Sequence, residues 1–416
     1  MSKLVYKNFF FLFLVQFSNY VLPFLVIPLL TRALGVEGFG KYAFYLGVAN
    51  LLLVFIRFGF EFSATRQISV NSDNKQKVGE IVGAVIQIKL ILFIVTAIIY
   101  SLIIFLFKPD QLNGLLLLGG LLLLLGQTLL PIWYFQGMQQ MKYVTFYTVV
   151  TKIIYVGLLF IVIREKQDYG IAVVIYGLSF FVAGLLSLIQ VIRSVPLSGG
   201  FMSGKVKEVF NEALPFFTSR VCVTTYTSSI TPLIGFIGSP TQVAIYSASE
   251  KLYMAAQSLM YPLANALFPH VAKNKDVSLF KKLFVGAVSL MLVGSVIGYF
   301  IAPWLIDVLF GAEFYQSTQI FNLHLIALIF VFPSILLGYP LLAALGFSKE
   351  ANGSVIIGAI LFFIIVAGLF LLNLTDATYF VWAVIATEAS VFFIRGYMAM
   401  TRVFKVNSVK PTLGDV

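Results

Sequence analysis

Runs of about 20 apolar residues recur along the whole chain, and this feature limits the possible fold more than any other. A helix of that length crosses the hydrocarbon core of a bilayer, where only helices and closed barrels satisfy their own backbone groups. Of the 416 residues, 60% are hydrophobic and 11% are charged, and the mean hydropathy is +0.98. Soluble proteins carry charge on about a quarter of their residues. The sequence therefore predicts an all-α polytopic membrane protein.

Twelve such runs are long enough to span, and the longest connection, between the sixth and the seventh, divides them into two equal groups. We expect two six-helix bundles, residues 1–195 and 213–416, joined by a cytoplasmic linker at 196–212. The first run has no small-residue cleavage site, so we expect a retained span and not a removed signal. The runs lie at about 9–30, 42–62, 81–107, 112–135, 143–163, 170–192, 214–237, 242–269, 283–308, 320–346, 353–374 and 378–401.

The distribution of basic residues predicts the orientation of these spans. The chain has 28 lysines and arginines against 17 acids, a net charge of +11. The outer loops would hold only Arg32, Lys41, Lys108, Arg164 and Lys166, whereas most of the other basic residues fall in inner segments. Cytoplasmic loops carry such an excess, so both termini are predicted to be cytoplasmic. The charge then reflects orientation and gives no indication of a nucleic-acid partner.

Six basic residues fall inside the predicted spans and need a separate explanation. A central arginine or lysine costs roughly 2.5–3.5 kcal/mol on insertion scales. One interpretation is structural, with buried ion pairs and with side chains that extend to the headgroups. For the set as a whole we favour a water-filled cavity with surplus positive charge, which would bind an anionic cargo. The six are Arg57, Lys89, Lys152, Arg220, Lys251 and Arg395.

Polar stripes in apolar runs point to the same cavity. In the second predicted span, Tyr42, Asn50, Arg57 and Glu61 would lie within an arc of about 100° on one helical face. The eighth span carries a similar stripe, and the seventh is rich in hydroxyl groups. We therefore predict polar, cavity-lining residues on the first, second, seventh and eighth spans, namely Gln16, Asn19, Asn50, Thr224, Tyr246, Tyr253 and Gln257.

Three acids lie well inside the predicted spans: Glu61, Glu250 and Glu388. An intramembrane carboxylate is a candidate proton or sodium site, and the alternative for each is a structural partner to a nearby cation. Nine prolines also lie inside spans, and each leaves a backbone carbonyl without its helical donor. They are Pro23, Pro28, Pro131, Pro215, Pro232, Pro262, Pro303, Pro333 and Pro340.

The sequence contains no complete motif for phosphate binding, metal binding or nucleophilic catalysis. The stretch "GVEGFGKY" nearly matches a phosphate-binding loop, but Tyr42 stands where serine or threonine is required and no strand precedes it. One cysteine and two histidines leave almost no ligands for a metal centre. The chain has no plausible nucleophile–histidine–acid set. We expect neither an enzyme nor a cofactor, apart from a coupling H⁺ or Na⁺.

Three stretches carry a family resemblance: "NYVLPFLVIPLLTRALGVEGFGKYAF" (19–44), "FGFEFSATRQIS" (58–69) and "LLPIWYFQGMQQMKYVT" (129–145). Together they resemble the bacterial O-antigen flippases, in the superfamily that also holds multidrug and toxin extrusion exporters and lipid II flippases. Relatives often have an acid just before the FGF stretch, where this chain has Arg57, so no acidic role is carried over to position 57.

The resemblance implies a V-shaped pair of six-helix bundles in the bacterial cytoplasmic membrane. The implied cargo is an undecaprenyl-pyrophosphate-linked oligosaccharide, moved from the cytoplasmic to the periplasmic leaflet by ion-coupled alternating access. Its implied partners are this lipid-linked sugar, membrane lipids and other polysaccharide-assembly proteins.

Two alternatives stay open. A small-molecule exporter of the same fold would carry organic cations and would favour a cavity with surplus acid, whereas here six basic residues face three acids. A membrane glycosyltransferase or polymerase usually needs a sizeable outer loop, and the predicted outer loops are short.

Overall fold

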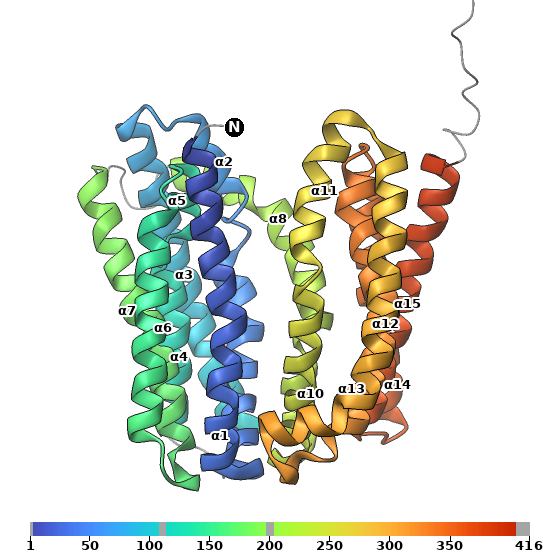
Figure 1. Cartoon of the computed structure of the whole chain (residues 1–416). Helices are drawn as coiled ribbons and strands as arrows, with labels where there is room; N and C mark the ends of the chain where they lie inside the picture. The colour runs from blue at the N-terminus through green and yellow to red at the C-terminus, as the bar shows by residue number, and fades with distance from the viewer. Residues whose placement is uncertain (1–2, 108–113, 197–203, 405–416) are drawn as a thin grey trace, which may run out of the picture. The chain divides into compact units, whose positions relative to one another are not determined.

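The computed structural model describes residues 3–107, 114–196 and 204–404, and for residues 3–23 and 219 it describes the backbone alone. The elements of this part of the chain are helices (Figure 1), as the all-α prediction requires. Nine helical segments within it are long and apolar enough to cross a membrane: Phe24–Arg57, Lys75–Leu106, Gly114–Gly137, Met141–Val162, Lys166–Ser194, Val277–Phe310, Ser317–Ala343, Ser348–Leu371 and Ala377–Phe404.

The chain divides by its internal contacts into two compact units, Met1–Ala244 and Ile245–Val416. This division falls later than the expected linker at 196–212, because α8 and α9 pack against α1 of the first unit. Unit 1 holds α1 (Lys3–Arg57), α2 (Ser63–Val70), α3 (Lys75–Phe107), α4 (Gly114–Leu129), α5 (Ile132–Gly137), α6 (Met141–Val162), η2 (Lys166–Asp168), α7 (Tyr169–Ser194), α8 (Gly204–Ser228) and α9 (Ile230–Ile237).

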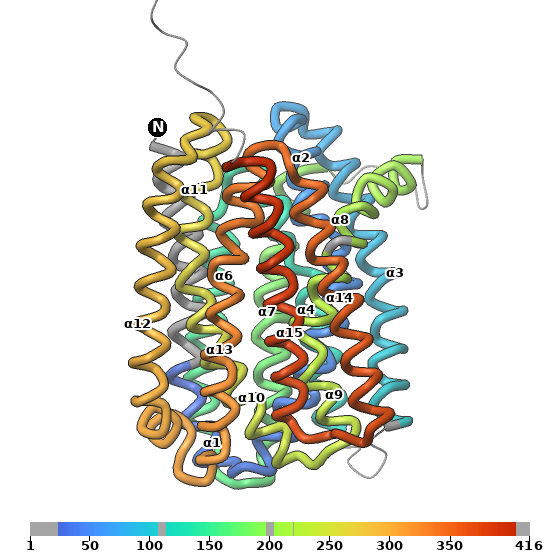
Figure 2. Tube along the Cα trace, turned by 90° about the vertical axis from the view of Figure 1, so that its right-hand side faces the viewer, coloured from blue at the N-terminus to red at the C-terminus, as the bar shows by residue number. Residues whose placement is uncertain are grey.

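Unit 2 begins inside α10 and is built around four long helices, α12 to α15, that pack side by side (Figure 2). Its elements are α10 (Pro240–Ser258), α11 (Tyr261–Asn274), α12 (Val277–Phe310), η3 (Ala312–Phe314), α13 (Ser317–Leu336), η4 (Leu337–Ala343), α14 (Ser348–Leu371), α15 (Ala377–Met398) and η5 (Ala399–Phe404). The segments η4 and η5 are π-helical, a geometry that is rare and often lies at functional sites.

The first two predicted spans form one helical element, α1, with a kink at Gly35 (φ 65°, ψ −177°). The helix ends at Arg57 because Phe58 and Gly59 adopt positive φ values of 46° and 76°, which a right-handed helix does not accommodate. Glu61 therefore lies beyond the helix. The predicted stripe that placed Glu61 on one helical face with Tyr42, Asn50 and Arg57 is wrong for this reason.

The predicted seventh and eighth spans are each interrupted. The run 214–237 is divided between α8 and α9 at Ser229, and the run 242–269 is divided between α10 and α11 at Leu259 and Met260. These broken, more polar segments are not among the nine apolar spans, and the first two predicted spans count there as one. The two interrupted spans and the merged first pair account for the difference between the twelve predicted spans and the nine apolar segments.

Close glycine contacts hold α4 against α7 in unit 1. A Cβ at Gly119 would lie 2.5 Å from the carbonyl carbon of Val173, and a Cβ at Gly177 would lie 2.2 Å from the oxygen of Gly119. Gly126 and Gly184 repeat this contact two turns along. Small residues let helix backbones approach closely within a membrane, so these glycines set the spacing of the two helices.

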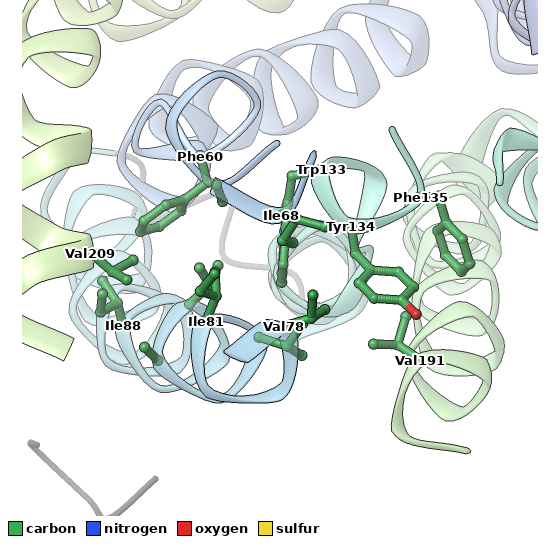
Figure 3. Packing of buried hydrophobic residues seen from close by; sticks show 14 of the residues in the cluster. Phe60, Ile68, Val78, Ile81, Ile88, Trp133, Tyr134, Phe135, Val191 and Val209 are labelled. Atoms are coloured by element: carbon green, nitrogen blue, oxygen red, sulfur yellow. The ribbon is translucent and has the colours of Figure 1, made fainter. Parts of the chain in front are cut away.

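A buried apolar cluster fills the end of unit 1 where α2 and α5 lie (Figures 1 and 3). Phe60, Trp133 and Phe135 are 1%, 3% and 0% exposed. They pack with aliphatic side chains of α3, among them Val78, Ile81 and Ile88, and with Val209 of α8. The cluster joins two of the three stretches that carry the family resemblance, 58–69 and 129–145, into one packed body.

Candidate anion-binding site

The connection between α1 and α2, which we call the Arg57–Phe62 turn, presents polar groups outward from this apolar cluster. The N–H of Phe60 donates to the carbonyl of Arg57 at 3.0 Å, and the N–H of Phe62 donates to that of Gly59 at 3.0 Å. Phe58 and Phe60 point into the cluster, whereas the Arg57 side chain is exposed and that of Glu61 is partly buried. The turn is thus anchored by its aromatic residues and leaves a guanidinium at the surface of the unit.

Paired phenylalanines fasten this turn to α8. Phe58 stacks on Phe217 with ring centroids 4.4 Å apart and on Phe210 at 4.8 Å. Phe62 stacks on Phe216 at 5.7 Å. A Cβ at Gly59 would lie 2.6 Å from the Cβ of Phe216, so glycine is needed there for space as well as for its positive φ. We call these contacts the phenylalanine seam.

The seam places a second arginine beside the turn. The Arg220 guanidinium of α8 lies over the Phe62 ring, 4.9 Å from its centroid, a distance at which a cation–π attraction acts. Arg220 is exposed. Within the described part of the chain, neither Arg57 nor Arg220 donates a hydrogen bond from its guanidinium to a protein oxygen. Planar guanidinium forks bind phosphate oxygens in pairs, so this junction has the chemistry of an anion site.

Lys89 belongs to the same region but is buried, with 4% of its surface exposed. Its Nζ donates to the backbone oxygen of Gln127 in α4 at 2.9 Å. The charges of Glu61 and Arg57 both act on this ammonium group. The structural alternative, in which Glu61 would pair with the nearby Arg57, is not met by a direct ion pair, since no N···O contact within 4.0 Å joins these two described residues.

Arg395, in unit 2, occupies a different environment. It is 7% exposed. Its Nε donates to Ser354 Oγ at 2.9 Å, one terminal nitrogen donates to the carbonyl and hydroxyl oxygens of Ser334 at 2.8 and 3.2 Å, and the other donates to the carbonyl of Ala351 at 3.3 Å. The charge of Arg395 also acts on buried Glu388 two turns earlier in α15. Arg395 ties α13, α14 and α15 together, which is a structural role.

The predicted tyrosines of α10 pack around a histidine that the sequence did not single out. His324 of α13 is 1% exposed, and its Nδ1 lies 2.6 Å from Ser249 Oγ. Tyr253 stacks on the imidazole at 4.7 Å, and Tyr246 meets it edge-on at 5.6 Å. A lone histidine in an apolar run gave no signal of this contact. Tyr253 and Tyr246 are themselves buried, at 9% and 2% exposure.

The other predicted site residues are spread over several helices. Lys251 is half-buried, and the charge of Glu250 acts on it. Lys152, Thr224 and Gln257 are half-buried on α6, α8 and α10, and Asn50 is exposed on α1. Gln16 and Asn19 fall in the segment 3–23, of which the structure describes the backbone alone. The described residues contain no group of three His, Cys, Asp or Glu side chains arranged to hold a metal ion.

The aromatic residues of the seam were also missed. The alternation of Phe58, Phe60 and Phe62 is visible in the sequence, and so is the Phe216–Phe217 pair. Only the packing of α8 on the turn shows that the two sets meet.

Comparison with known sequences gives a consistent result. A family model described as "Polysaccharide biosynthesis protein" matches residues 5–275. An Escherichia coli (strain K12) protein named "Putative O-antigen transporter" is 31% identical over 300 residues, which cover 69% of this chain and 72% of that protein. A Shigella dysenteriae protein of the same name is 28% identical over 319 residues, covering 75% and 80%.

Solved structures show the same fold at low sequence identity. An inward-facing multidrug resistance MATE family transporter of the MOP superfamily matches with a TM-score of 0.68 and 13% identity, over 94% of this chain and 97% of that one. The lipid II flippase MurJ in an inward closed conformation matches with a TM-score of 0.64 and 14% identity, over 92% and 88%.

The family match spans most of the chain, the curated relatives align over more than two thirds of it, and the apolar helices cross a membrane many times. The resemblance drawn from the three sequence stretches is confirmed. The chain belongs to the polysaccharide biosynthesis protein family and is a multi-pass protein of the bacterial inner membrane.

Proposed function

We propose that the protein is a flippase that moves an undecaprenyl-pyrophosphate-linked oligosaccharide from the cytoplasmic to the periplasmic leaflet by alternating access. The observation that carries this proposal is the junction of the Arg57–Phe62 turn with α8, where Arg57 and Arg220 are both exposed. The names of the curated relatives, O-antigen transporters, support the same cargo class.

The chemistry of the junction suits a pyrophosphate. This group is a compact multiple anion, and two guanidinium groups offer it paired, charge-assisted hydrogen bonds. Arg220 is held over Phe62, so this side chain loses less freedom on binding than an unrestrained arginine would. The apolar surroundings weaken competition from water. The lipid tail remains in the bilayer, and the sugars face polar side chains farther along the helices.

The proposed topology has twelve membrane passes in two six-helix bundles with both termini in the cytoplasm. The kink at Gly35 and the paired helices α8–α9 and α10–α11 supply the passes beyond the nine apolar spans. The turn would then lie at the cytoplasmic side, where the cargo is made. With the cell interior negative, outward movement of each negative charge gains about 2.3 kcal/mol per 100 mV.

A coupling ion, H⁺ or Na⁺, is part of the proposal, with Glu250 as its first candidate because it is half-buried beside Lys251. Glu388 lies near Arg395 and serves better as a structural counter-charge. No catalytic step is proposed, and other polysaccharide-assembly proteins are the proposed partners.

The test is transport of a defined lipid-linked oligosaccharide in proteoliposomes with imposed ion gradients and membrane potential. Arg57→Ala and Arg220→Ala should each slow transport by about tenfold or more, because each removes charge-assisted hydrogen bonds. Arg164→Ala is the matched control: Arg164 is an exposed arginine just after the C-terminal end of α6, the end that is far from α5.

Equal transport by wild type, Arg57→Ala and Arg220→Ala would reject the junction as the cargo site. Wild-type vesicles that export an organic cation and leave the lipid-linked sugar in place would favour the multidrug alternative.

A further inference from the structure

The break between α4 and α5 has an unusual hydrogen-bond pattern. The N–H of Leu130 still donates to the carbonyl of Gly126 at 3.0 Å, so the helical pattern continues up to that residue. Residue 131 would donate next, to the carbonyl of Gln127. It is proline and has no N–H. The Gln127 oxygen is therefore left without its helical donor in an apolar environment, where an unpaired carbonyl is costly.

The side chain of Lys89 supplies the missing donor. Its Nζ lies 2.9 Å from the Gln127 oxygen and comes from the neighbouring helix α3. A buried ammonium group is itself expensive unless it is hydrogen-bonded and balanced by charge. Here the carbonyl and the charge of Glu61 provide these interactions. The Gln127 carbonyl thus receives a donor, and the buried Lys89 ammonium group receives an acceptor.

The break and the Arg57–Phe62 turn belong to one packed body. Leu130 and Trp133, on either side of Pro131, lie in the same buried cluster as Phe58, Phe60 and Ile88. Thr65 Oγ1, at the start of α2, donates to the carbonyl of Trp133 at 3.1 Å. A shift of the break would therefore reach the turn that presents Arg57.

We propose that Lys89 is a positioning residue and not a cargo ligand: its ammonium group completes the helix broken at Pro131 and so fixes the turn that holds Arg57. This assignment rests on the proposed function for its effect on transport. It also gives a role to Pro131 within the stretch "LLPIWYFQG" (129–137).

The experiment combines Lys89→Met with Pro131→Ala, which restores an N–H opposite the Gln127 oxygen. Hydrogen exchange of the amides of residues 126–137 is measured in lipid nanodiscs without cargo. Lys89→Met should raise exchange there by about tenfold, and the double variant should return it toward the wild-type level. Lys152→Met, which removes a half-buried lysine from α6, is the control and should leave this segment unchanged.

Transport gives the second readout. Lys89→Met should raise the cargo concentration needed for half-maximal rate, and Pro131→Ala in the same chain should lower it again. A direct cargo ligand would not be rescued in this way. Unchanged exchange in Lys89→Met, or additive losses in the double variant, would overturn the proposal. If the double variant fails to fold, the exchange of Lys89→Met decides alone, and this readout is independent of whether the cargo is the one proposed.

Discussion

Arg57 in unit 1 and Arg395 in unit 2 both stand in apolar sequence, and their surroundings differ in almost every respect. Arg395 is 7% exposed and gives its hydrogen bonds to Ser334, Ala351 and Ser354. Arg57 is exposed, at the point where α1 ends. Arg395 has its donors committed to protein oxygens, whereas the Arg57 guanidinium donates to no protein oxygen in the described part of the chain. The role of a charged residue in a membrane helix therefore follows from its tertiary contacts and not from its position within an apolar run.

Removing the buried arginine should have the largest effect. Arg395→Ala removes its buried hydrogen bonds to Ser334, Ala351 and Ser354 and the charge near Glu388, so we expect a loss of about 3–5 kcal/mol of stability. Thermal unfolding of the purified protein in detergent measures it. Arg395→Lys should also destabilise, because one ammonium group cannot reproduce the guanidinium's hydrogen bonds to both α13 and α14. A stable, monodisperse Arg395→Ala protein would contradict the structural role that distinguishes Arg395 from Arg57.

Distorting the Arg57–Phe62 turn should have an intermediate effect. Gly59→Ala adds a Cβ that would lie 2.6 Å from Phe216 Cβ, at a φ of 76°, and we expect a cost of about 1–3 kcal/mol together with slower transport. Gly346→Ala is the matched control, since Gly346 has a φ of 97° with nothing within 4 Å. Equal effects of the two changes on stability and transport would mean that the seam does not hold the turn in place.

Weakening the contact beneath Arg220 should have the smallest effect. Phe62→Leu keeps an apolar side chain but removes the aromatic face under the guanidinium, worth about 0.5–1 kcal/mol at an exposed site. Cargo affinity should fall by about two- to fivefold, and the unfolding temperature should fall only slightly, because the stacking of Phe62 on Phe216 is lost while the other contacts of the seam remain. A loss as large as that of Arg220→Ala would show that Phe62 contacts the cargo itself.

The sequence predicted the helical membrane class because apolar runs of span length are a direct consequence of the bilayer. It did not predict where α1 ends. Arg57 and Glu61 have helical spacing, and only the positive φ values of Phe58 and Gly59 show that the helix stops between them.

The site was predicted less well than the fold. Composition identified the six intramembrane cations as a group, but Arg57 and Arg395 are indistinguishable by local sequence. What separates them is contact with distant segments, such as Ser334 and Ser354 for Arg395. The burial of Tyr253 against His324, about seventy residues later in the chain, is likewise a tertiary contact that periodicity does not report.

The central claim is that Arg57 and Arg220 bind the anionic head of a lipid-linked sugar, and its most direct test is equilibrium binding in nanodiscs. Undecaprenyl pyrophosphate is the probe and undecaprenol, which has the same tail, is the reference. We predict that wild type and Arg164→Ala bind the pyrophosphate lipid alike, and that Arg57→Ala and Arg220→Ala each weaken this binding by about tenfold without changing that of undecaprenol. Unaltered pyrophosphate affinity in both of these variants would contradict the account.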